Sequence, residues 1–370
     1  MTPTVAQGLA RLTAATLLCL APFQVQAHSD LTLVNFGGSA ARAQMLALLR
    51  PWEKETGSYA TMEEYNGGIE EIRRQVDSAN VTWDVIDMEY SDLIQACEEG
   101  LLETFDLGSL PPGGDGTPAA EDFRSGALHE CGVGNLIWST VYAYNGDEFA
   151  TEPTTIADFF DVEAFPGKRG IRRDPRGILE WALMADGVAA GDVYSQLGTP
   201  RGLDRAFDKL AGIHSDIVWW ERGPQPAQLL GEDAVSMSMA WNGRLFRPIT
   251  EDGRDIRIVW DGQIWEYDLF AIPKGSRNLQ AALDFVRYAT STDKLAEWTT
   301  FISYGPARKS SAAKVSPEME PLLPTSEVNM TNALRYDSQW WAQNIDKIRP
   351  RFEAFASPDF GQEGAQAGRF

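Results

Sequence analysis

Histidine is scarce in this chain, and the motifs that hold nucleotides or build common hydrolases are absent. The 370 residues include three histidines, His28, His129 and His214. Protein zinc and copper sites draw heavily on histidine, so we expect no metal site. There is no G-x-G-x-x-G after a strand-like run, no Walker A loop, no H-E-x-x-H and no G-x-S-x-G. We therefore expect no cofactor and no catalytic residues. Chance carboxylate pairs are inevitable among 53 acidic residues, so a secreted acidic hydrolase stays as an alternative.

Long apolar runs are equally scarce. The main candidate, residues 12–23, carries no charge and is too short to span a bilayer. Val25 and Ala27 then provide small residues at the −3 and −1 positions of a cleavage site. We predict a signal peptide over 1–27 and a periplasmic mature chain. A buried N-terminal helix and a lipoprotein attached through Cys19 are the alternatives.

Cysteine is also rare, and one of the three, Cys19, lies within the predicted signal peptide. Cys97 and Cys131 remain, an even number in an oxidising compartment, so a disulfide between them is the default. It would tether a loop that contains the Pro- and Gly-rich stretch 105–123. Two separate buried thiols are the alternative.

Positive charge is in short supply, because 32 Lys and Arg face 53 Asp and Glu, for a formal net charge of −21. Such a surface repels nucleic acid and anionic lipid, so we expect neither as a partner. The chain is long enough for two lobes. Beyond the predicted signal peptide, no apolar run reaches the roughly 18 residues of a membrane span. We expect a monomer.

Strand-like and helix-like runs alternate along most of the chain. β-type runs are expected at 31–36, 59–65 and 83–88, and helical spacing follows them at 40–54, 69–79 and 90–99. Later strands are expected at 137–144, 170–173, 217–220, 234–241, 257–260 and 265–272. This alternation is typical of a parallel α/β sheet.

Several segments carry a family resemblance through their order and spacing. They are VNFGG…PWEKETG at 34–57, WDVIDMEYSD at 83–92, CEEGLLE at 97–103, CGVGNLIWSTVYAYN at 131–145, FPGKRGIRR at 165–173, SMAWNGR at 238–244, YDLFAIPKGS at 267–276 and FISYGPARKS at 301–310. Together they resemble the periplasmic solute-binding proteins of bacterial ABC importers, in the branch that includes the spermidine/putrescine-binding proteins.

The resemblance implies a type II periplasmic binding protein fold, in which two α/β lobes joined by two hinge crossovers close on a ligand. The first lobe would comprise 28–138 plus 262–313, and the second 139–261. The tail, 314–370, would be helical and pack on the first lobe. The implied partner is an ABC permease in the inner membrane.

The resemblance also implies a set of ligand-binding residues in the cleft. Polyamine-binding proteins hold an alkyl chain between aromatic rings and ammonium groups with acids. Their aromatic and acidic positions match Phe36, Trp241, Asp268 and Tyr304. The full candidate set is Phe36, Gly37, Gly38, Ser39, Glu89, Trp241, Arg244, Glu266, Tyr267, Asp268 and Tyr304.

This chain departs from the polyamine pattern in four places. Glu266 stands at a stacking position where an aromatic is expected, and an acid expected at the start of a second-lobe helix is absent. Gly37-Gly38-Ser39 stands where an acid follows the first aromatic, and Arg244 stands where an acid can follow the W-x-G motif. Aromatic faces with carboxylates suit an organic amine, which is the main hypothesis. Arg244 and the glycine turn would instead favour an anionic group. A zwitterion such as an opine or an amino-acid derivative is therefore the alternative, and Arg244 could equally bridge the two lobes.

Overall fold

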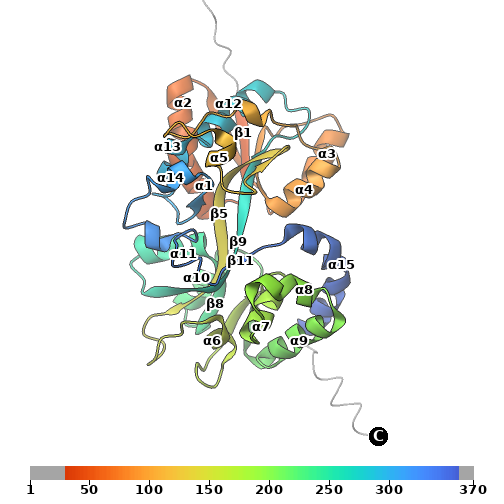
Figure 1. Ribbon diagram of the computed structural model, residues 1–370, viewed down its shortest axis with the longest axis vertical. Coiled ribbons are helices and arrows are strands. Elements are labelled where there is room, and N and C mark those ends of the chain that lie inside the picture. The colour runs from red at the N-terminus through yellow and green to blue at the C-terminus, as the bar shows by residue number, and fades with distance from the viewer. Residues whose placement is uncertain (1–29, 358–370) are drawn as a thin grey trace, which may run out of the picture.

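The computed structural model describes residues 30–357, and the predicted signal peptide lies outside them. Within these residues eleven strands form one mixed sheet, whose main path runs β2-β1-β3-β9-β5-β8-β6-β7. Figure 1 shows an upper and a lower lobe, with the sheet continuing from one into the other. The protein therefore has the two-lobed α/β architecture that the sequence predicts.

The first lobe, the upper one in Figure 1, is built on three parallel strands: β1 (Asp30–Asn35), β2 (Tyr59–Glu64) and β3 (Val85–Glu89). Val85, Ile86 and Met88 of β3 are all fully buried, as expected for a strand that is covered on both faces. Around these strands lie α1 (Gly38–Gln44), a π-helical segment (Met45–Leu49), α2 (Arg50–Thr56), α3 (Glu70–Asp77), α4 (Tyr90–Glu98), α5 (Ala119–Asp122), α12 (Leu279–Ala289), α13 (Thr292–Trp298) and α14 (Lys309–Ala312).

The second lobe is also built on parallel strands. β6 (Arg169–Arg172) pairs with both β7 (Ile217–Trp220) and β8 (Met237–Trp241). Its helices are α6 (Ile156–Phe160), α7 (Ile178–Ala185), α8 (Val193–Leu197), α9 (Pro200–Ala211), α10 (Gln225–Gly231) and α11 (Asn242–Thr250).

Two long antiparallel strands, β5 (Gly132–Asn145) and β9 (Ile256–Ala271), run through both lobes. β9 pairs with β3 in the first lobe, and β5 pairs with β8 in the second. These strands are the two predicted hinge crossovers. The expected strands at 257–260 and 265–272 are one continuous strand, because Gly262 adopts φ 74° and lets the chain pass through an irregularity without ending. The lobe boundaries near 138 and 262 stay a prediction.

Short strands complete the sheet beside the crossovers. β4 (Leu128–His129) and β10 (Gly305–Pro306) pair with β5, and β11 (Leu334–Arg335) pairs with β9. β11 brings the chain back to the hinge after the first lobe is complete.

Each lobe has a hydrophobic core of its own. The largest fully buried side chains of the first core include Phe270 and Phe285. Those of the second include Phe159 and Trp181. Because the cores are separate clusters, the lobes can change their relative orientation without repacking either interior.

The tail helix α15 (Ser338–Phe355) buries its apolar side chains in the second core and also contacts α4 of the first lobe, so the assignment of the tail to the first lobe stays a prediction. Its buried side chains, Trp341 and Phe352 among them, belong to the second core. The Trp341 indole N–H donates to Glu180 of α7 over 2.6 Å. The aromatic surface that covers this face of the helix comes from the second lobe, and burying it there determines the docking.

Cys97 and Cys131 are joined in a disulfide, with their Cα atoms 5.9 Å apart. The two sulfurs and a ring nitrogen of His129 lie within 4.8 Å of one another. Disulfide formation removes both thiolates as ligands, so this group cannot hold a metal ion while the bond is intact. Non-reducing peptide mapping of protein purified from the periplasm should recover the Cys97 and Cys131 peptides cross-linked. Two freely alkylated thiols would contradict the pairing.

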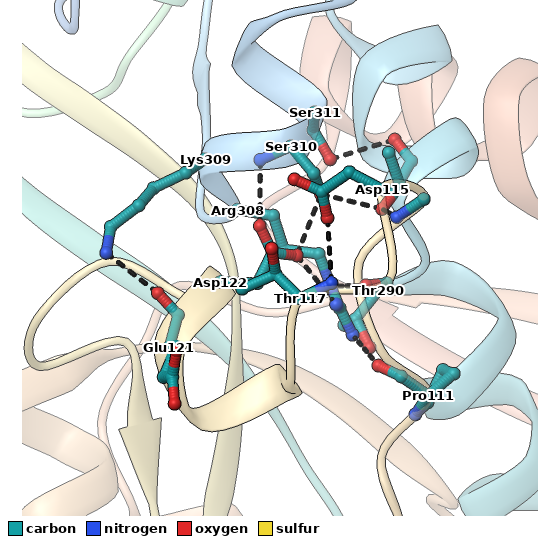
Figure 2. A network of polar contacts seen from close by, with 12 residues as sticks. Pro111, Asp115, Thr117, Glu121, Asp122, Thr290, Arg308, Lys309, Ser310 and Ser311 are labelled. Atoms are coloured by element: carbon teal, nitrogen blue, oxygen red, sulfur yellow. Dashed lines mark hydrogen bonds and ion pairs between the residues drawn. The ribbon is translucent and has the colours of Figure 1, made fainter.

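A buried ion pair holds the Pro- and Gly-rich loop against the C-terminal part of the first lobe (Figure 2). Arg308 and Asp122 are 0% and 2% exposed at their side chains, and Arg308 Nη1 lies 2.9 Å from Asp122 Oδ2. Arg308 also donates to the carbonyls of Thr290 and Pro111. The Ser310 amide and hydroxyl donate to the Asp122 carboxylate. All these charged atoms are paired, as burial requires.

Candidate functional site

The cleft between the lobes contains two neighbouring cavities that share Glu89, Trp138 and Trp241. Glu89 ends β3 and Trp241 ends β8, at the carboxyl edge of parallel strands where α/β sheets bind ligands. Besides the shared residues, one cavity is lined by Phe36, Asp87, Arg244, Asp268 and Tyr304, and we call it the acidic cavity. The other is lined by Arg172, Arg176, Trp220, Glu266 and Tyr336, and we call it the arginine cavity.

Asp268 and Glu89 are the acids best placed for a ligand cation. They are paired neighbours on β9 and β3. Burial, together with the negative charges of Asp87 and Glu89, raises the pKa of Asp268 well above its usual range. The Trp138 indole N–H donates to Asp268 Oδ1 over 2.9 Å. Glu89 occupies the N-cap position of α4, but its side chain makes no capping bond, so its carboxylate is available to the cavity.

Asp87 lies beneath the acidic cavity in a buried polar network. Its carboxylate accepts bonds from Gln44 Nε2 over 2.5 Å and from Asn135 Nδ2 over 2.6 Å. Asn35 in turn donates to Gln44. Burial raises the pKa of Asp87 to about 7, and the bonds from Asn135 and Gln44 oppose that rise. Asp87 therefore adds negative potential while its oxygens are held by protein donors.

Two further carboxyls increase the crowding of negative charge. Glu266 accepts a bond from the Ser338 hydroxyl over 2.5 Å, and burial and the charge of Glu89 raise its pKa well above the usual range. Burial and the charge of Glu89 likewise raise the pKa of Asp92 to about 6. The free cleft is thus an unfavourable place for all these groups to be ionised, and a bound cation would relieve it.

Two arginines bring positive charge to the other cavity. Arg176 is held by Asp174, which accepts from Nε over 2.8 Å and from Nη2 over 2.9 Å. Arg172 lies with its guanidinium 5.0 Å from the centre of the Trp241 ring. Among the ion pairs of residues 30–357, none involves Arg172. Against the effect of burial, the hydrogen bond from Arg176 and the charge of Arg172 lower the pKa of Asp174. A planar guanidinium that makes no direct ion pair is suited to bind a ligand carboxylate.

Aromatic rings form the walls between these charges. Trp138 and Trp241 meet edge to face with their centroids 6.1 Å apart, and Trp220 meets Trp241 in the same way at 5.9 Å. Phe36 packs against Tyr65 with centroids 5.0 Å apart. Such walls bind methylene groups and attract cations through their faces.

Arg244 connects the lobes across the mouth of the acidic cavity. It extends from α11 and donates to the backbone carbonyls of Gly37 and Phe36 over 3.2 and 3.1 Å. Gly38 has φ +60°, and a Cβ there would lie 2.5 Å from Arg244 Nη1, so the glycine turn makes room for the contact. A second contact between the lobes is the exposed ion pair between Arg42 of α1 and Glu251, which directly follows α11. The lobes are therefore in contact around the cleft.

The structure brings most of the predicted site residues together. Phe36, Glu89, Trp241, Arg244, Glu266, Asp268 and Tyr304 line the two cavities. Gly37 takes part through its carbonyl, whereas Gly38 and Ser39 line an outer groove beside Arg42. Tyr267 is the exception: its side chain belongs to the first core, and its hydroxyl donates to the Ser125 carbonyl. Whether the cleft residues contact ligand stays a prediction.

Sequence reasoning missed several residues of the cleft. Asp87 stands within the recognised WDVIDM strand, and Arg172 stands one residue before the end of the expected strand at 170–173, so both had a positional signal. Trp138 lies in a crossover strand, where nothing local indicates which face is exposed. Of the tandem tryptophans, Trp220 lines the arginine cavity, while Trp219 packs on Phe352 of the tail.

A family model described as bacterial extracellular solute-binding protein matches residues 47–325. A γ-aminobutyric acid-binding protein of Pseudomonas aeruginosa is 37% identical over 352 residues, which cover 95% of this chain and 97% of that protein.

Solved structures of similar proteins share the architecture. The binding protein MotA of A. tumefaciens B6, in complex with glucopine, matches with a TM-score of 0.79 and 28% identity, over 89% of this chain and all of that one. An ABC transporter substrate-binding protein from Bradyrhizobium japonicum has 31% identity and a TM-score of 0.79, over 89% of this chain and 100% of that one.

These similarities, together with the two-lobed fold, also decide the general questions that the sequence raised. Within residues 30–357, no helix combines the length and apolarity needed to cross a membrane. The family members are transport proteins rather than enzymes. The chain thus belongs to the bacterial extracellular solute-binding proteins, as the periplasmic component of an ABC importer that binds a small molecule.

Proposed function

We propose that the protein captures a small zwitterion, an ω-amino acid of the γ-aminobutyrate type, and delivers it to an inner-membrane permease. One observation carries this proposal: two adjoining cavities of one cleft differ in their charged groups. The acidic cavity presents Asp87 and Asp268 beside Arg244, the arginine cavity presents Arg172 and Arg176 beside Glu266, and Glu89 lines both.

The ammonium end of such a ligand fits the acidic cavity. Asp268 and Glu89 can accept charge-assisted hydrogen bonds from it, and Phe36 and Tyr304 border the same space. Tyr304 is a neutral neighbour, since burial raises the pKa of its hydroxyl to about 12.

The carboxylate end fits the arginine cavity. Arg172 is free of ion pairs, and Arg176 engages Asp174 through Nε and Nη2, which leaves Nη1 for a ligand. The methylene groups would pass along Trp138 and Trp241, which border both cavities. A single ligand can therefore satisfy both charged ends and the aromatic wall.

The relatives favour a zwitterion over the polyamine-like amine of the main sequence hypothesis. The Pseudomonas relative is named for γ-aminobutyric acid, and the A. tumefaciens neighbour was solved with glucopine. A diamine would place an ammonium group beside Arg172 and Arg176, whose like charges oppose the attraction of Glu89 and Glu266 in the same cavity.

Titration calorimetry with γ-aminobutyrate, putrescine and butyrate tests the proposal. We expect γ-aminobutyrate to bind much more tightly than either single-sign analogue, because each analogue leaves one set of buried charges unpaired. Putrescine binding more tightly than γ-aminobutyrate would overturn the zwitterion and restore the amine hypothesis.

Arg172→Gln should weaken γ-aminobutyrate binding by about tenfold, the lower end of what a hydrogen bond to a charged group contributes, because Arg176 remains. Calorimetry of the variant measures the loss. Arg201→Gln removes the same charge from an exposed position on α9 and should leave the affinity unchanged. Equal affinities for Arg172→Gln and the wild type would show that the ligand carboxylate is held elsewhere.

A further inference from the structure

We infer that Trp138 is a specificity-determining residue, a partition between the two cavities that limits the length and bulk of the ligand. This inference rests on the proposed function, because it assumes a ligand with one charged end in each cavity. Glu89, Trp138 and Trp241 are the side chains common to both cavities. Glu89 is a ligand acid in the proposal, so the two tryptophans form the dividing wall.

Trp138 owes its position to the first crossover strand. It lies on β5 and is paired with Glu266 of β9, two residues along the strand from the pair that Leu136 forms with Asp268. Its side chain is partly exposed, whereas its neighbours on the strand are buried. The hinge itself therefore supplies this ring, and it stands where the two cavities meet.

The ring is fixed from two sides. Its indole N–H donates to Asp268 Oδ1 over 2.9 Å, and its edge-to-face contact with Trp241 leaves the centroids 6.1 Å apart. Trp241 is itself held by Trp220 and by the guanidinium of Arg172. A side chain with a hydrogen bond and a packed ring partner cannot turn aside at low cost.

A fixed partition restricts the length and bulk of the ligand chain that connects the ammonium group to the carboxylate. Asp268 lies on one side of it and Arg172 on the other, so the ligand must span a set distance past the edge of the indole. A linear methylene chain can pass, whereas extra methylenes must fold into space that Trp138 occupies. Even one methylene in a tight apolar passage can change affinity by about tenfold or more.

A chain-length series tests the inference by competition calorimetry. The probes are 3-aminopropanoate, γ-aminobutyrate, 5-aminopentanoate and 6-aminohexanoate, measured against wild type, Trp138→Ala and Trp138→Phe. In Trp138→Ala we expect the preference for the best wild-type probe over 6-aminohexanoate to fall by about tenfold, because the added space accepts the longer chain.

Trp138→Phe is the matched control. It keeps a ring in the partition and removes the indole N–H that Asp268 accepts. We expect it to weaken the whole series by a similar factor and to preserve the order of preference. A role limited to orienting Asp268 would instead give Trp138→Ala and Trp138→Phe the same selectivity profile, which would overturn the partition.

The outcomes separate this inference from the proposed function. If the wild type binds no member of the series, the proposed function fails. If the wild type discriminates by length and folded Trp138→Ala keeps the same ratios, the partition fails while the function stands. Circular dichroism verifies the fold, and Trp138→Leu gives the same comparison should the alanine variant be unstable.

Discussion

Replacing Asp122 by asparagine is expected to lower the free energy of unfolding by about 3–5 kcal/mol, the cost of leaving one partner of a buried ion pair uncompensated. Arg308 has no exposed side-chain surface, so water cannot replace the lost carboxylate. The same substitution weakens the acceptor for the Ser310 amide and hydroxyl (Figure 2). Denaturant unfolding followed by circular dichroism measures the change.

Glu121→Gln provides the matched control, since it removes the same charge one residue earlier. Glu121 is exposed, and its bond to Lys309 uses the backbone carbonyl rather than the carboxylate. Exposed charges contribute little to stability, so this variant should unfold within about 0.5 kcal/mol of the wild type. An equally small effect in Asp122→Asn would mean that the Asp122–Arg308 pair does not anchor the loop.

The fold was largely predictable because its signals are local. Strand-like runs such as 83–88 are apolar, and the helical spacing that follows them repeats along the chain. The site residues Glu89 and Trp241 were also accessible in this way, because each stands where a strand ends and parallel strands present their carboxyl ends to the ligand. The alternation of strands and helices, together with the position of these residues at strand ends, was therefore enough to predict where the cleft lies.

Tyr267 was included in the candidate site with its neighbours Glu266 and Asp268, although its side chain lies on the other face of the strand. Glu266 and Asp268 both reach the cleft, and successive residues of a strand point to opposite faces. The residue between them must therefore face away, and Tyr267 accordingly packs in the first core and bonds to Ser125. The alternation alone could have excluded it.

Contacts between segments that are distant in sequence were harder to predict. The amphipathic pattern of the tail helix indicates a buried face but not the surfaces that cover it, which come from the second core and from α4. Arg244 carries chemistry that suits either a ligand anion or a bridge, and only the geometry shows its bonds to the carbonyls of Phe36 and Gly37. Trp138 was missed because its exposure depends on how two crossovers and two lobes meet.

Ligand affinity is expected to fall by about a hundredfold between roughly pH 8 and pH 5, as protons compete with the ligand ammonium for the cleft carboxyls. Burial raises the pKa of Asp87 to about 7, and burial with neighbouring acids raises the pKa of Asp268 well above its usual range. A bound ammonium favours the ionised carboxyls and lowers these pKa values. Binding therefore releases protons, and affinity decreases as pH falls through the pKa values of the free protein.

The charged groups around the cleft determine the size of this effect. The remaining carboxyls come from Glu89 on β3, Asp92 on α4 and Glu266 on β9, and the opposing cations are Arg172, Arg176 and Arg244. A linear ω-amino acid keeps both its charges over this pH range, so the protein supplies the titration.

Calorimetry in two buffers of different ionisation enthalpy counts the protons released at each pH. Asp268→Asn should weaken binding and flatten the pH dependence, because it removes the carboxyl nearest the proposed ammonium position. Asp208→Asn, at an exposed position on α9, should change neither. Constant affinity with no proton release across the range would mean that ligand binding does not change the protonation of the buried carboxyls. Competition between protons and the ligand ammonium would then contribute nothing to binding.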